Sequence, residues 1–520
     1  MRLWQAIEVA VKRFSGRRFV FDTYGRTLTF IEFRERAISA AAGLRELGIG
    51  RDSRVSWQLP SGLEAAVLMV ALSRLGAIQN PVIMSLREAE LRTVSSTFDP
   101  EFVFVPGRFR GCDHRALAES VFPAATVVTV DANGPEGAAQ AGIALPAADP
   151  VELSLIPDSD GTRWVYLTSG TSKEPKGVKH TDKSLWFSPE SMMAAVPLQA
   201  DDVFPIAFPF AHIGGVVWLI AALRIGLALQ MIDVFDPARS PLEMAGAGAT
   251  ILGSATPFFE AYLDAQRRHG SARLFSRLRF CLAGGAPVAA DLDERVRTEL
   301  GGEGVLNGYG LTECPLLGFP PMPDRHGMRS RSSWLPGPGA AIRIVDPGGA
   351  DLRAGQEGEL LVRAPQMFSG YLDPSLDTDA LDDQGFLHTG DLAILGTHGE
   401  VTITGRLKEV VVRKGENISM LEVEDVLIRH PDIADVAVIG LPDRLSGERC
   451  CAALVVRDQA PVPSRGELRT FCRSQGLAAF KSPEEVVVVS QIPRNAMGKI
   501  QRNTLRELVL GEAKQSKSAT

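Results

Sequence analysis

Residues 166–177 read YLTSGTSKEPKG, a loop rich in glycine and hydroxyl groups that follows an apolar run and closes on a lysine and a glycine. Glycines let a backbone approach a ligand closely, and the amide, hydroxyl and ammonium groups of such a loop can bind an anion. The common P-loop pattern, G-x-x-x-x-G-K-[ST], does not fit the spacing of Gly170, Thr171 and Lys176. The stretch therefore predicts either a phosphate-binding loop of another kind or an ordinary solvated turn.

The composition is that of a large globular protein. With 520 residues, 45% hydrophobic and 22% charged, the chain predicts several domains or subdomains. Its net charge of −7 argues against a broad basic surface, so we expect no nucleic-acid partner. The six cysteines show neither C-x-x-C nor metal-finger spacing, which indicates reduced thiols in a cytoplasmic protein.

Neither export nor membrane insertion is predicted. The first 14 residues have helical apolar spacing that Glu8 and Lys12 interrupt, unlike a signal peptide. The most apolar run, 213–223, is too short to span a bilayer and ends at Arg224. We expect a buried helix there, with membrane contact that is peripheral at most.

Strand and helix patterns alternate through the first three quarters of the chain. Thr29 and Glu32 form a T-x-x-E capping box before a helical apolar pattern that stops at Gly48. Similar reasoning gives helices at 63–75, 183–193 and 257–268 and strands at 55–59, 101–105, 126–130, 227–232 and 250–253. This alternation predicts two α/β subdomains with parallel sheets, joined by a loosely ordered connection at 131–160.

The last third of the chain has a different sequence pattern, with short strands in place of the strand and helix alternation. From residue 337, short strands at 341–345, 358–362, 387–395 and 401–404 predict a β-rich subdomain. Beyond a boundary near 405 we expect one small α+β domain, with helices at 421–429 and 465–474 and strands at 410–412, 436–440 and 452–456. The predicted domains are thus 1–405 and 406–520, with a disordered tail after Leu510.

Five further stretches carry side chains suited to nucleotide chemistry. They are AGGAP at 283–287, NGYGLTE at 307–313, FLHTGD at 386–391, GRLKEVVVRKGENI at 405–418 and PRNAMGKIQR at 493–502.

Two of these stretches have the features of an adenine and metal site. Gly284 and Gly285 would leave bare backbone against a flat group, and Tyr309 offers an aromatic face for stacking a base. Glu313 supplies a hard oxygen ligand suited to Mg²⁺ that bridges phosphates. Taken alone, the glycines could equally form a tight turn and the tyrosine could belong to the core.

The later stretches add charged groups. Asp391 could accept hydrogen bonds from two ribose hydroxyls, and Arg406 could meet it or a phosphate. Lys499, beside a glycine in a turn-prone segment, could stabilise charge that develops in an acyl-phosphate reaction. Taken singly, the aspartate could be a capping residue and the lysine a solvated one.

Together and in this order, the six stretches resemble those of the adenylate-forming superfamily of acyl-CoA synthetases, adenylation domains and luciferases. The resemblance runs from about Leu28 to about Arg506. It implies an α/β fold with a large N-terminal domain of two α/β subdomains plus a β-rich subdomain, and a small mobile α+β C-terminal domain. It also implies two half-reactions, in which a carboxylate and ATP form acyl-AMP and a thiol then takes the acyl group.

The resemblance assigns roles to individual residues. It implies that the β- and γ-phosphates are held by Thr168, Ser169, Gly170, Thr171 and Lys176. It implies that adenine is lined by Gly284, Gly285, Ala286, Asn307, Gly308 and Tyr309. Thr312 would approach the α-phosphate, Glu313 and Thr168 would serve Mg²⁺, Asp391 would bind ribose with Arg406 nearby, and Lys499 would bridge the carboxylate and the α-phosphate.

Three further assignments concern the acyl group, the hinge and the thiol. His212, in FPFAHIGG, matches a histidine that borders the acyl pocket, although a satisfied core histidine remains an alternative. Lys408 matches the hinge about which the small domain swings between half-reactions. Lys414, Gly415 and Glu416 match the CoA channel.

The chain departs from the family pattern at the phosphate loop, at the channel motif and, conservatively, at Phe386-Leu387, where Trp-Phe is usual. The phosphate loop commonly reads TSGTTG-x-PKG, but Ser172 and Lys173 stand here at the Thr-Gly pair. The channel motif commonly reads GGENI, but Lys414 stands here at its first glycine. We expect altered closure of the phosphate loop, and a long side chain that either crowds the channel or contacts the phosphates of CoA.

The leading expectation is an AMP-forming acid:CoA ligase of fatty acid metabolism, with ATP, Mg²⁺ and coenzyme A as cofactor and substrates. The predicted acyl site is apolar, which favours a hydrophobic monocarboxylic acid. It lies around His212, Gly214, Gly215, Trp218, residues 256–259, Gly310 and Cys314. One alternative is a stand-alone adenylating enzyme that loads a carrier protein. Another is a non-catalytic nucleotide- or acyl-binding scaffold, and a homodimer is left open.

Overall fold

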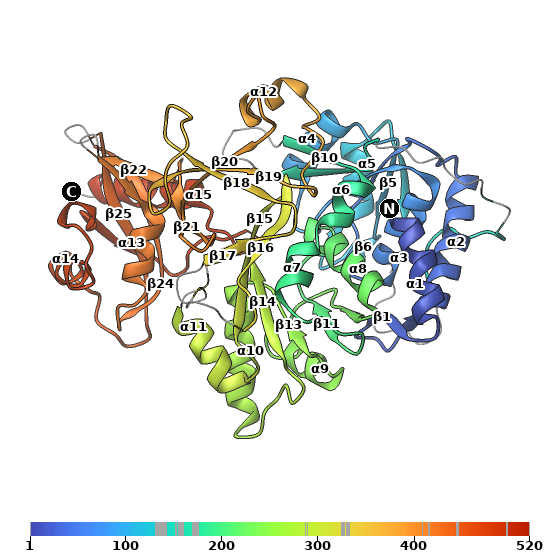
Figure 1. Cartoon of the computed structure of the whole chain (residues 1–520), viewed down its shortest axis with the longest axis horizontal. Helices are drawn as coiled ribbons and strands as arrows, with labels where there is room; N and C mark the ends of the chain where they lie inside the picture. Colours follow the sequence, from blue (N-terminus) through green and yellow to red (C-terminus); the bar gives the residue numbers. More distant parts are fainter. Residues whose placement is uncertain are drawn as a thin grey trace. The chain divides into compact units, whose positions relative to one another are not determined.

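The computed structural model describes residues 2–130, 143–150, 153, 161–168, 176–285, 288, 290–323, 328, 333–407, 409–413, 416–443, 447–495 and 498–518. Contacts divide the chain into two compact units, which are described separately below. Figure 1 labels the helices and strands. The first unit is Met1–Ala341 with Arg363–Phe386, and the second is Ile342–Val362 with Leu387–Thr520. Both units mix helices and strands, which confirms the predicted α/β class.

The first sheet of the first unit has the strand order β10-β9-β4-β3-β5-β8. Its strands are β3 (Arg54–Trp57), β4 (Ile78–Pro81), β5 (Phe102–Val105), β8 (Thr126–Thr129), β9 (Trp164–Thr168) and β10 (Lys176–His180). All neighbours are parallel except β10, which runs antiparallel to β9. The parallel sheet follows from the predicted alternation of strands and helices.

Helices cover this sheet because their sequences are apolar on the faces that pack. They are α3 (Leu63–Leu75), α4 (Glu88–Phe98) and α5 (His114–Val121), while α2 (Phe30–Glu46) packs on α3 and on the second sheet described below. The predicted capping box at Thr29 and Glu32 is present at the start of α2. Every residue of α3 except Arg74 is buried, since α3 is apolar on all sides and packs beside α1 and α2.

A second sheet of this unit has the order β11-β12-β1-β2. Its strands are β1 (Arg18–Asp22), β2 (Thr27–Thr29), β11 (Val203–Ile206) and β12 (Ala228–Met231). Helix α8 (Ile213–Ile225) contacts β12, helices α1 (Leu3–Phe14) and α6 (Asp182–Phe187) contact α8, and α7 (Glu190–Ala195) follows α6. The apolar run predicted at 213–223 is the buried helix α8, and none of the described helices meets the length and hydropathy that a membrane crossing requires.

The remaining strands of the first unit follow the order β13-β14-β15-β16-β17. They are β13 (Ile251–Leu252), β14 (Phe280–Gly284), β15 (Val305–Leu311), β16 (Cys314–Phe319) and β17 (Ser333–Pro336). Beside them lie α9 (Ser240–Gly246), α10 (Thr256–His269), α11 (Ala290–Arg295) and the π-helix η1 (Val296–Leu300), followed later by η3 (Pro374–Leu376) and α12 (Asp377–Ala380). Short strands β6 (Arg108–Phe109) and β7 (Cys112–Asp113) form a separate pair.

The second unit contains two groups of strands. The first, in the order β21-β20-β19-β18, is β18 (Ala341–Val345), β19 (Glu357–Arg363), β20 (Leu387–Leu395) and β21 (Val401–Arg406). The second, in the order β23-β22-β25-β24 with β26 on β25, is β22 (Val410–Arg413), β23 (Glu416–Ser419), β24 (Ile433–Asp443), β25 (Gly447–Val456) and β26 (Glu485–Val488). Its helices are α13 (Met420–Leu427), α14 (Arg465–Ser474), η4 (Ala479–Lys481) and α15 (Arg502–Ser518).

Several predicted details differ from the structure. The helix predicted at 183–193 is two helices, α6 and α7, since Ser188 and Pro189 interrupt it. The tail predicted to be disordered after Leu510 continues as helix α15 to Ser518. Contacts group residues 342–362 and 387–405 with the second unit. The boundary near 405 was predicted for a domain that moves between half-reactions, and it stays a prediction.

Candidate active site

Strands β9 and β10 bring together the two ends of the predicted phosphate-binding loop, residues 166–177. Thr168 pairs with Lys176 across the antiparallel ladder, and the Thr168 hydroxyl lies 3.5 Å from the Lys176 carbonyl oxygen. The predicted phosphate-binding residues Ser169, Gly170 and Thr171 lie outside the described residues, as do Ser172 and Lys173. The hairpin therefore presents the hydroxyl of Thr168 and the ammonium of Lys176 at the mouth of one loop.

Tyr371 joins this hairpin to the predicted metal ligand. Its phenol donates a hydrogen bond of 2.9 Å to Oε1 of Glu313, and the Lys176 Nζ lies 4.7 Å from the centroid of its ring. Burial, and next the nearby Glu313 carboxylate, raises the pKa of Tyr371 well above its usual range, so the phenol keeps its proton. A lysine, a tyrosine and a glutamate thus form one contiguous polar cluster.

His180 fixes the backbone next to Glu313. Its Nε2 donates a hydrogen bond of 2.8 Å to the carbonyl oxygen of Thr312, and its Nδ1 lies 3.0 Å from the Ser184 hydroxyl. Burial lowers the pKa of His180 from 6.5 to about 4, so the ring is neutral at pH 7. The Phe368 amide also donates to the Glu313 carbonyl at 2.8 Å. These bonds hold the turn that carries Thr312 and Glu313.

The predicted adenine residues lie on two adjacent parallel strands. Gly284 on β14 is the register partner of Gly308 on β15, and Ala283 is that of Asn307. A Cβ on Gly308 would lie 2.3 Å from the Phe319 ring, whereas one on Gly284 would lie 3.5 Å from its nearest neighbour. The structure therefore brings these two motifs side by side, and packing explains the glycine at 308.

Trp334 stacks on Tyr309, the aromatic residue of the predicted adenine site. Its indole lies parallel to the Tyr309 ring, with centroids 4.8 Å apart and an interplanar angle of 6°. Gly285 has a φ of 83°, which favours glycine at the end of β14. Ala286 lies outside the described residues. Because Trp334 covers one face of Tyr309, the predicted base stacking concerns the opposite face.

His212 begins helix α8. Its Nδ1 accepts a hydrogen bond of 3.1 Å from the Gly214 amide, which caps the helix, and its ring meets Phe208 edge-on at 6.5 Å. Farther along α8, Trp218 stacks on Phe204 with centroids 3.6 Å apart. The surroundings of the predicted acyl site are thus aromatic and apolar, while the role of His212 toward an acyl group stays a prediction.

Asp391 and Arg406 form an ion pair in the second unit. They are register partners on β20 and β21, and the Arg406 Nε lies 2.6 Å from Oδ1 of Asp391. Nearby, the Glu359 carboxylate accepts from the Gly390 amide at 3.3 Å and lies 3.0 Å from the His388 Nδ1. The predicted contact between Asp391 and Arg406 is therefore present, and Glu359 on β19 bonds to the HTGD residues of β20.

The Lys499 segment belongs to the second unit. Lys499 is exposed, and its backbone amide donates a hydrogen bond of 3.0 Å to Oδ1 of Asn495. Lys408, Lys414 and Gly415 lie outside the described residues. Glu416 begins β23, where its backbone pairs with Arg413. The hinge and CoA-channel assignments stay predictions.

The donor set fits magnesium as a phosphate-bridging ion. Mg²⁺ commonly binds proteins through one or two carboxylates, with phosphates and waters as its other ligands. The described residues contain no group of three or more His, Cys, Asp or Glu side chains that could hold a metal by themselves. Glu313, with an acceptor oxygen oriented by Tyr371, therefore suits an ion that arrives with ATP.

Sequence reasoning missed Tyr371, His180 and Trp334. Tyr371 follows a glycine and precedes a leucine, a context typical of a loop aromatic, and nothing local connects it with Glu313. The histidine at the end of β10 offered a better signal, since it lies four residues after the loop lysine. All three act through partners that are distant in sequence.

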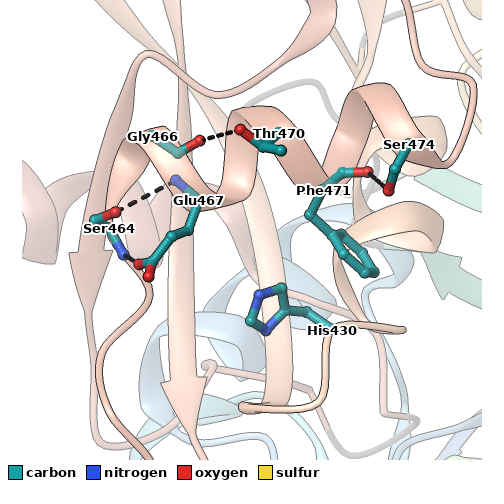
Figure 2. A pocket seen from close by; sticks show the side chains of 7 residues that line it. All are labelled: His430, Ser464, Gly466, Glu467, Thr470, Phe471 and Ser474. Atoms are coloured by element: carbon teal, nitrogen blue, oxygen red, sulfur yellow. Dashed lines mark hydrogen bonds between the residues drawn. The ribbon is translucent and has the colours of Figure 1, made fainter.

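One hollow lies elsewhere, along helix α14 in the second unit (Figure 2). It has a volume of about 610 Å³, and His430, Glu467 and Phe471 are among its lining residues. The hydrogen bonds drawn in Figure 2 cap or follow the helix itself, such as those between Ser464 and Glu467. None of the predicted site residues lines this hollow.

Comparisons with known proteins find matches along most of the chain. The family described as AMP-binding enzyme matches residues 7–372, and the AMP-binding enzyme C-terminal domain matches residues 422–499. The chain is 31% identical over 501 residues to the medium-chain fatty-acid–CoA ligase of Escherichia coli (strain K12), covering 94% of this chain and 87% of that protein.

Two further likenesses widen the picture. The chain is 32% identical over 525 residues to a salicyl-AMP ligase/salicyl-S-ArCP synthetase of Mycobacterium tuberculosis, covering 95% of this chain and 88% of that protein. The crystal structure of ATP-bound MatB from Rhodopseudomonas palustris superposes with a TM-score of 0.83 at 27% identity, covering 98% of this chain and 99% of that one. The chain therefore belongs to the AMP-binding enzyme family, within the adenylate-forming superfamily.

Proposed function

We propose that this enzyme is an AMP-forming acid:CoA ligase that activates a hydrophobic monocarboxylic acid. The observation that carries the proposal is the Lys176–Tyr371–Glu313 cluster, which combines a cation, a proton donor and a metal-type carboxylate in one place. A cation and a carboxylate suited to Mg²⁺ can neutralise the negative charge on phosphate oxygens, and this supports triphosphate binding. The likeness to the fatty-acid–CoA ligase supports this choice.

The proposed reaction has two steps. A carboxylate oxygen bonds to the α-phosphorus of ATP, the bond to the β-phosphate oxygen breaks, and pyrophosphate leaves. The sulfur of a thiolate then bonds to the acyl carbon, and AMP leaves with the electron pair of the broken C–O bond. Activation is needed because a free carboxylate would have to expel oxide, which is a far poorer leaving group than AMP.

The chain's own residues have distinct tasks in this proposal. Lys176 and Thr168 bind the outer phosphates, Gly284, Gly308 and Tyr309 accept the adenine, and Asp391 with Arg406 binds the ribose. Glu313 would hold Mg²⁺, which neutralises phosphate charge when bound. Lys499 neutralises charge between the carboxylate and the α-phosphate during the first step only.

The acyl group is proposed to be largely apolar. His212, Trp218 and Phe259 were predicted near it, and the latter two are buried among other aromatic rings. Apolar surroundings favour a medium-chain, alicyclic or aromatic acid over one with a second carboxylate. We also propose a cytoplasmic location, which the six free thiols support.

A second candidate is loading of a carrier protein. The 32% identity to the salicyl-AMP ligase/salicyl-S-ArCP synthetase favours it, because that name couples an adenylate to a carrier thiol. In this case the acid would be aromatic and the acceptor would be a phosphopantetheine arm. The first half-reaction is the same for both candidates.

The test is a panel of medium-chain, alicyclic and aromatic acids in a pyrophosphate-release assay, with CoA or a holo-carrier protein as acceptor. An acyl-CoA product supports the ligase. Pyrophosphate release with acylation of the carrier alone supports the second candidate. Absence of pyrophosphate release with every acid would leave only a binding scaffold and would overturn both.

A further inference from the structure

Backbone hydrogen bonds join the described residues 494–495 and 498–500 of the segment that carries Lys499. Arg494 and Ile500 form an antiparallel bridge. The Asn495 amide donates to the Lys499 carbonyl at 2.9 Å, and the Gly498 amide donates to the Asn495 carbonyl at 2.9 Å. Gly498 has a φ of 78°, a conformation that favours glycine. Hydrogen bonds within residues 494–500 therefore hold the backbone of Lys499 in place.

Arg494 attaches this loop to the sheet of the second unit. One guanidinium nitrogen donates to the Gly498 carbonyl at 3.0 Å. The other donates to both carboxylate oxygens of Asp435, on β24, at 2.8 and 3.0 Å. One side chain thus bonds at the same time to the residue before Lys499 and to strand β24.

A second arginine anchors the other end of the segment. Arg502, at the start of α15, donates to the buried carboxylate of Glu424 on α13 and, at 3.0 Å, to the Val438 carbonyl on β24. Arg502 is nearly enclosed by these partners, so its loss would disturb the fold. The Arg494–Asp435 pair is about one-third exposed, and such pairs add little to global stability. Its effect should therefore be local.

We infer that Arg494 is a positioning residue for Lys499, fixing the turn from which the lysine reaches the reacting groups. The inference rests on the proposed function of Lys499 in adenylation. A lysine side chain is long and flexible, so its reach depends on where its backbone is held. Misplacement of a catalytic group by about 1 Å can lower the rate by a factor of about 100. The bonds of Arg494 would therefore matter because they fix the position of the Lys499 backbone.

The first experiment compares Arg494→Gln with Arg506→Gln in both half-reactions. Arg506 pairs with Glu448 at 3.3 Å in the same unit and is similarly exposed, and this bond lies outside the segment 494–500, so Arg506→Gln is a matched control. For Arg494→Gln we expect kcat of pyrophosphate release to fall about tenfold, with KM for ATP nearly unchanged. Thioester formation from supplied acyl-AMP should stay at the wild-type rate.

Two more variants test the geometry. Arg494→Lys should rescue only part of the loss, since one ammonium lacks the fork that reaches Gly498 and Asp435 together. Asp435→Asn should lower pyrophosphate release in the same direction but less, because its amide oxygen can still accept. Equal losses in both half-reactions, or wild-type kinetics in Arg494→Gln, would overturn the positioning role.

A second readout does not depend on activity. Amide hydrogen exchange at Gly498 and Lys499 should be faster in Arg494→Gln than in the wild type, and unchanged in Arg506→Gln. If the wild type releases no pyrophosphate with any acid, the proposed function fails, and exchange alone decides the structural role of Arg494. Equal exchange in the wild type and Arg494→Gln would contradict that role.

Discussion

The phenol of Tyr371 donates a 2.9 Å hydrogen bond to the carboxylate of Glu313, a residue 58 positions earlier in the chain. The bond occupies one acceptor oxygen and orients the other. Removal of a group that orients a metal ligand commonly weakens metal binding by about 10- to 100-fold. Tyr371 thus contacts both Glu313 and Lys176, for which we propose roles in binding Mg²⁺ and phosphate.

Tyr371→Phe keeps the ring that lies under Lys176 and removes only the hydroxyl. We expect the Mg²⁺ concentration for half-maximal pyrophosphate release to rise about tenfold, because Glu313 loses its orienting donor. Tyr24→Phe is the matched control, since the Tyr24 phenol donates to Asp233 at 2.6 Å elsewhere in the first unit. An identical Mg²⁺ dependence in wild type and Tyr371→Phe would contradict the role.

Gly284→Ala tests the predicted adenine surface. The added Cβ would meet its nearest protein atom at 3.5 Å, an ordinary contact, so the thermal midpoint should change little. If the base lies against this glycine, ATP affinity measured by calorimetry should fall about tenfold, or about 1.4 kcal/mol.

Gly308→Ala provides the contrast. Its Cβ would lie 2.3 Å from the Phe319 ring, so the variant should lose about 1–3 kcal/mol of stability by overpacking. Unchanged ATP affinity in a fully folded Gly284→Ala protein would place adenine elsewhere.

His180 predicts a specific acid sensitivity. Its folded-state pKa is about 4 against an ordinary 6.5, so below pH 6.5 the unfolded chain binds a proton that the folded protein does not. Stability from this residue is complete above pH 6.5 and falls as the pH drops toward 4, by up to about 3 kcal/mol. Denaturant unfolding between pH 4 and 7 measures the slope.

His180→Gln should flatten this slope, because glutamine can still donate to the Thr312 carbonyl and does not titrate. The exposed His269, at the end of α10, serves as the control, and His269→Gln should keep the wild-type profile. A His180→Gln profile parallel to the wild type would show that the acid sensitivity arises elsewhere.

Lys499→Ala should separate the half-reactions. Loss of its charge should lower acyl-AMP formation by about 100-fold or more, since an electrostatic contact to the transferring phosphate disappears. Thioester formation from supplied acyl-AMP should persist. Lys481, which pairs with Glu422 in the same unit, supplies the control variant Lys481→Ala. Normal pyrophosphate release in Lys499→Ala would refute the assigned role.

The sequence by itself determined the features that depend on neighbours along the chain. The capping box of Thr29 and Glu32, the bounds of helix 63–75 and the apolar helix beginning at 213 follow from interactions a few residues apart. The order of the six motifs was likewise sufficient for the family, and residues 7–372 match it.

Only the tertiary structure decided which motifs meet. Gly284 and Gly308 lie side by side because β14 and β15 pair in one register, and no local pattern reveals that register. Tyr371, His180 and Arg494 were missed for the same reason, since each acts on a partner brought near by folding. Periodicity and capping are local, whereas strand pairing and side-chain networks join distant segments.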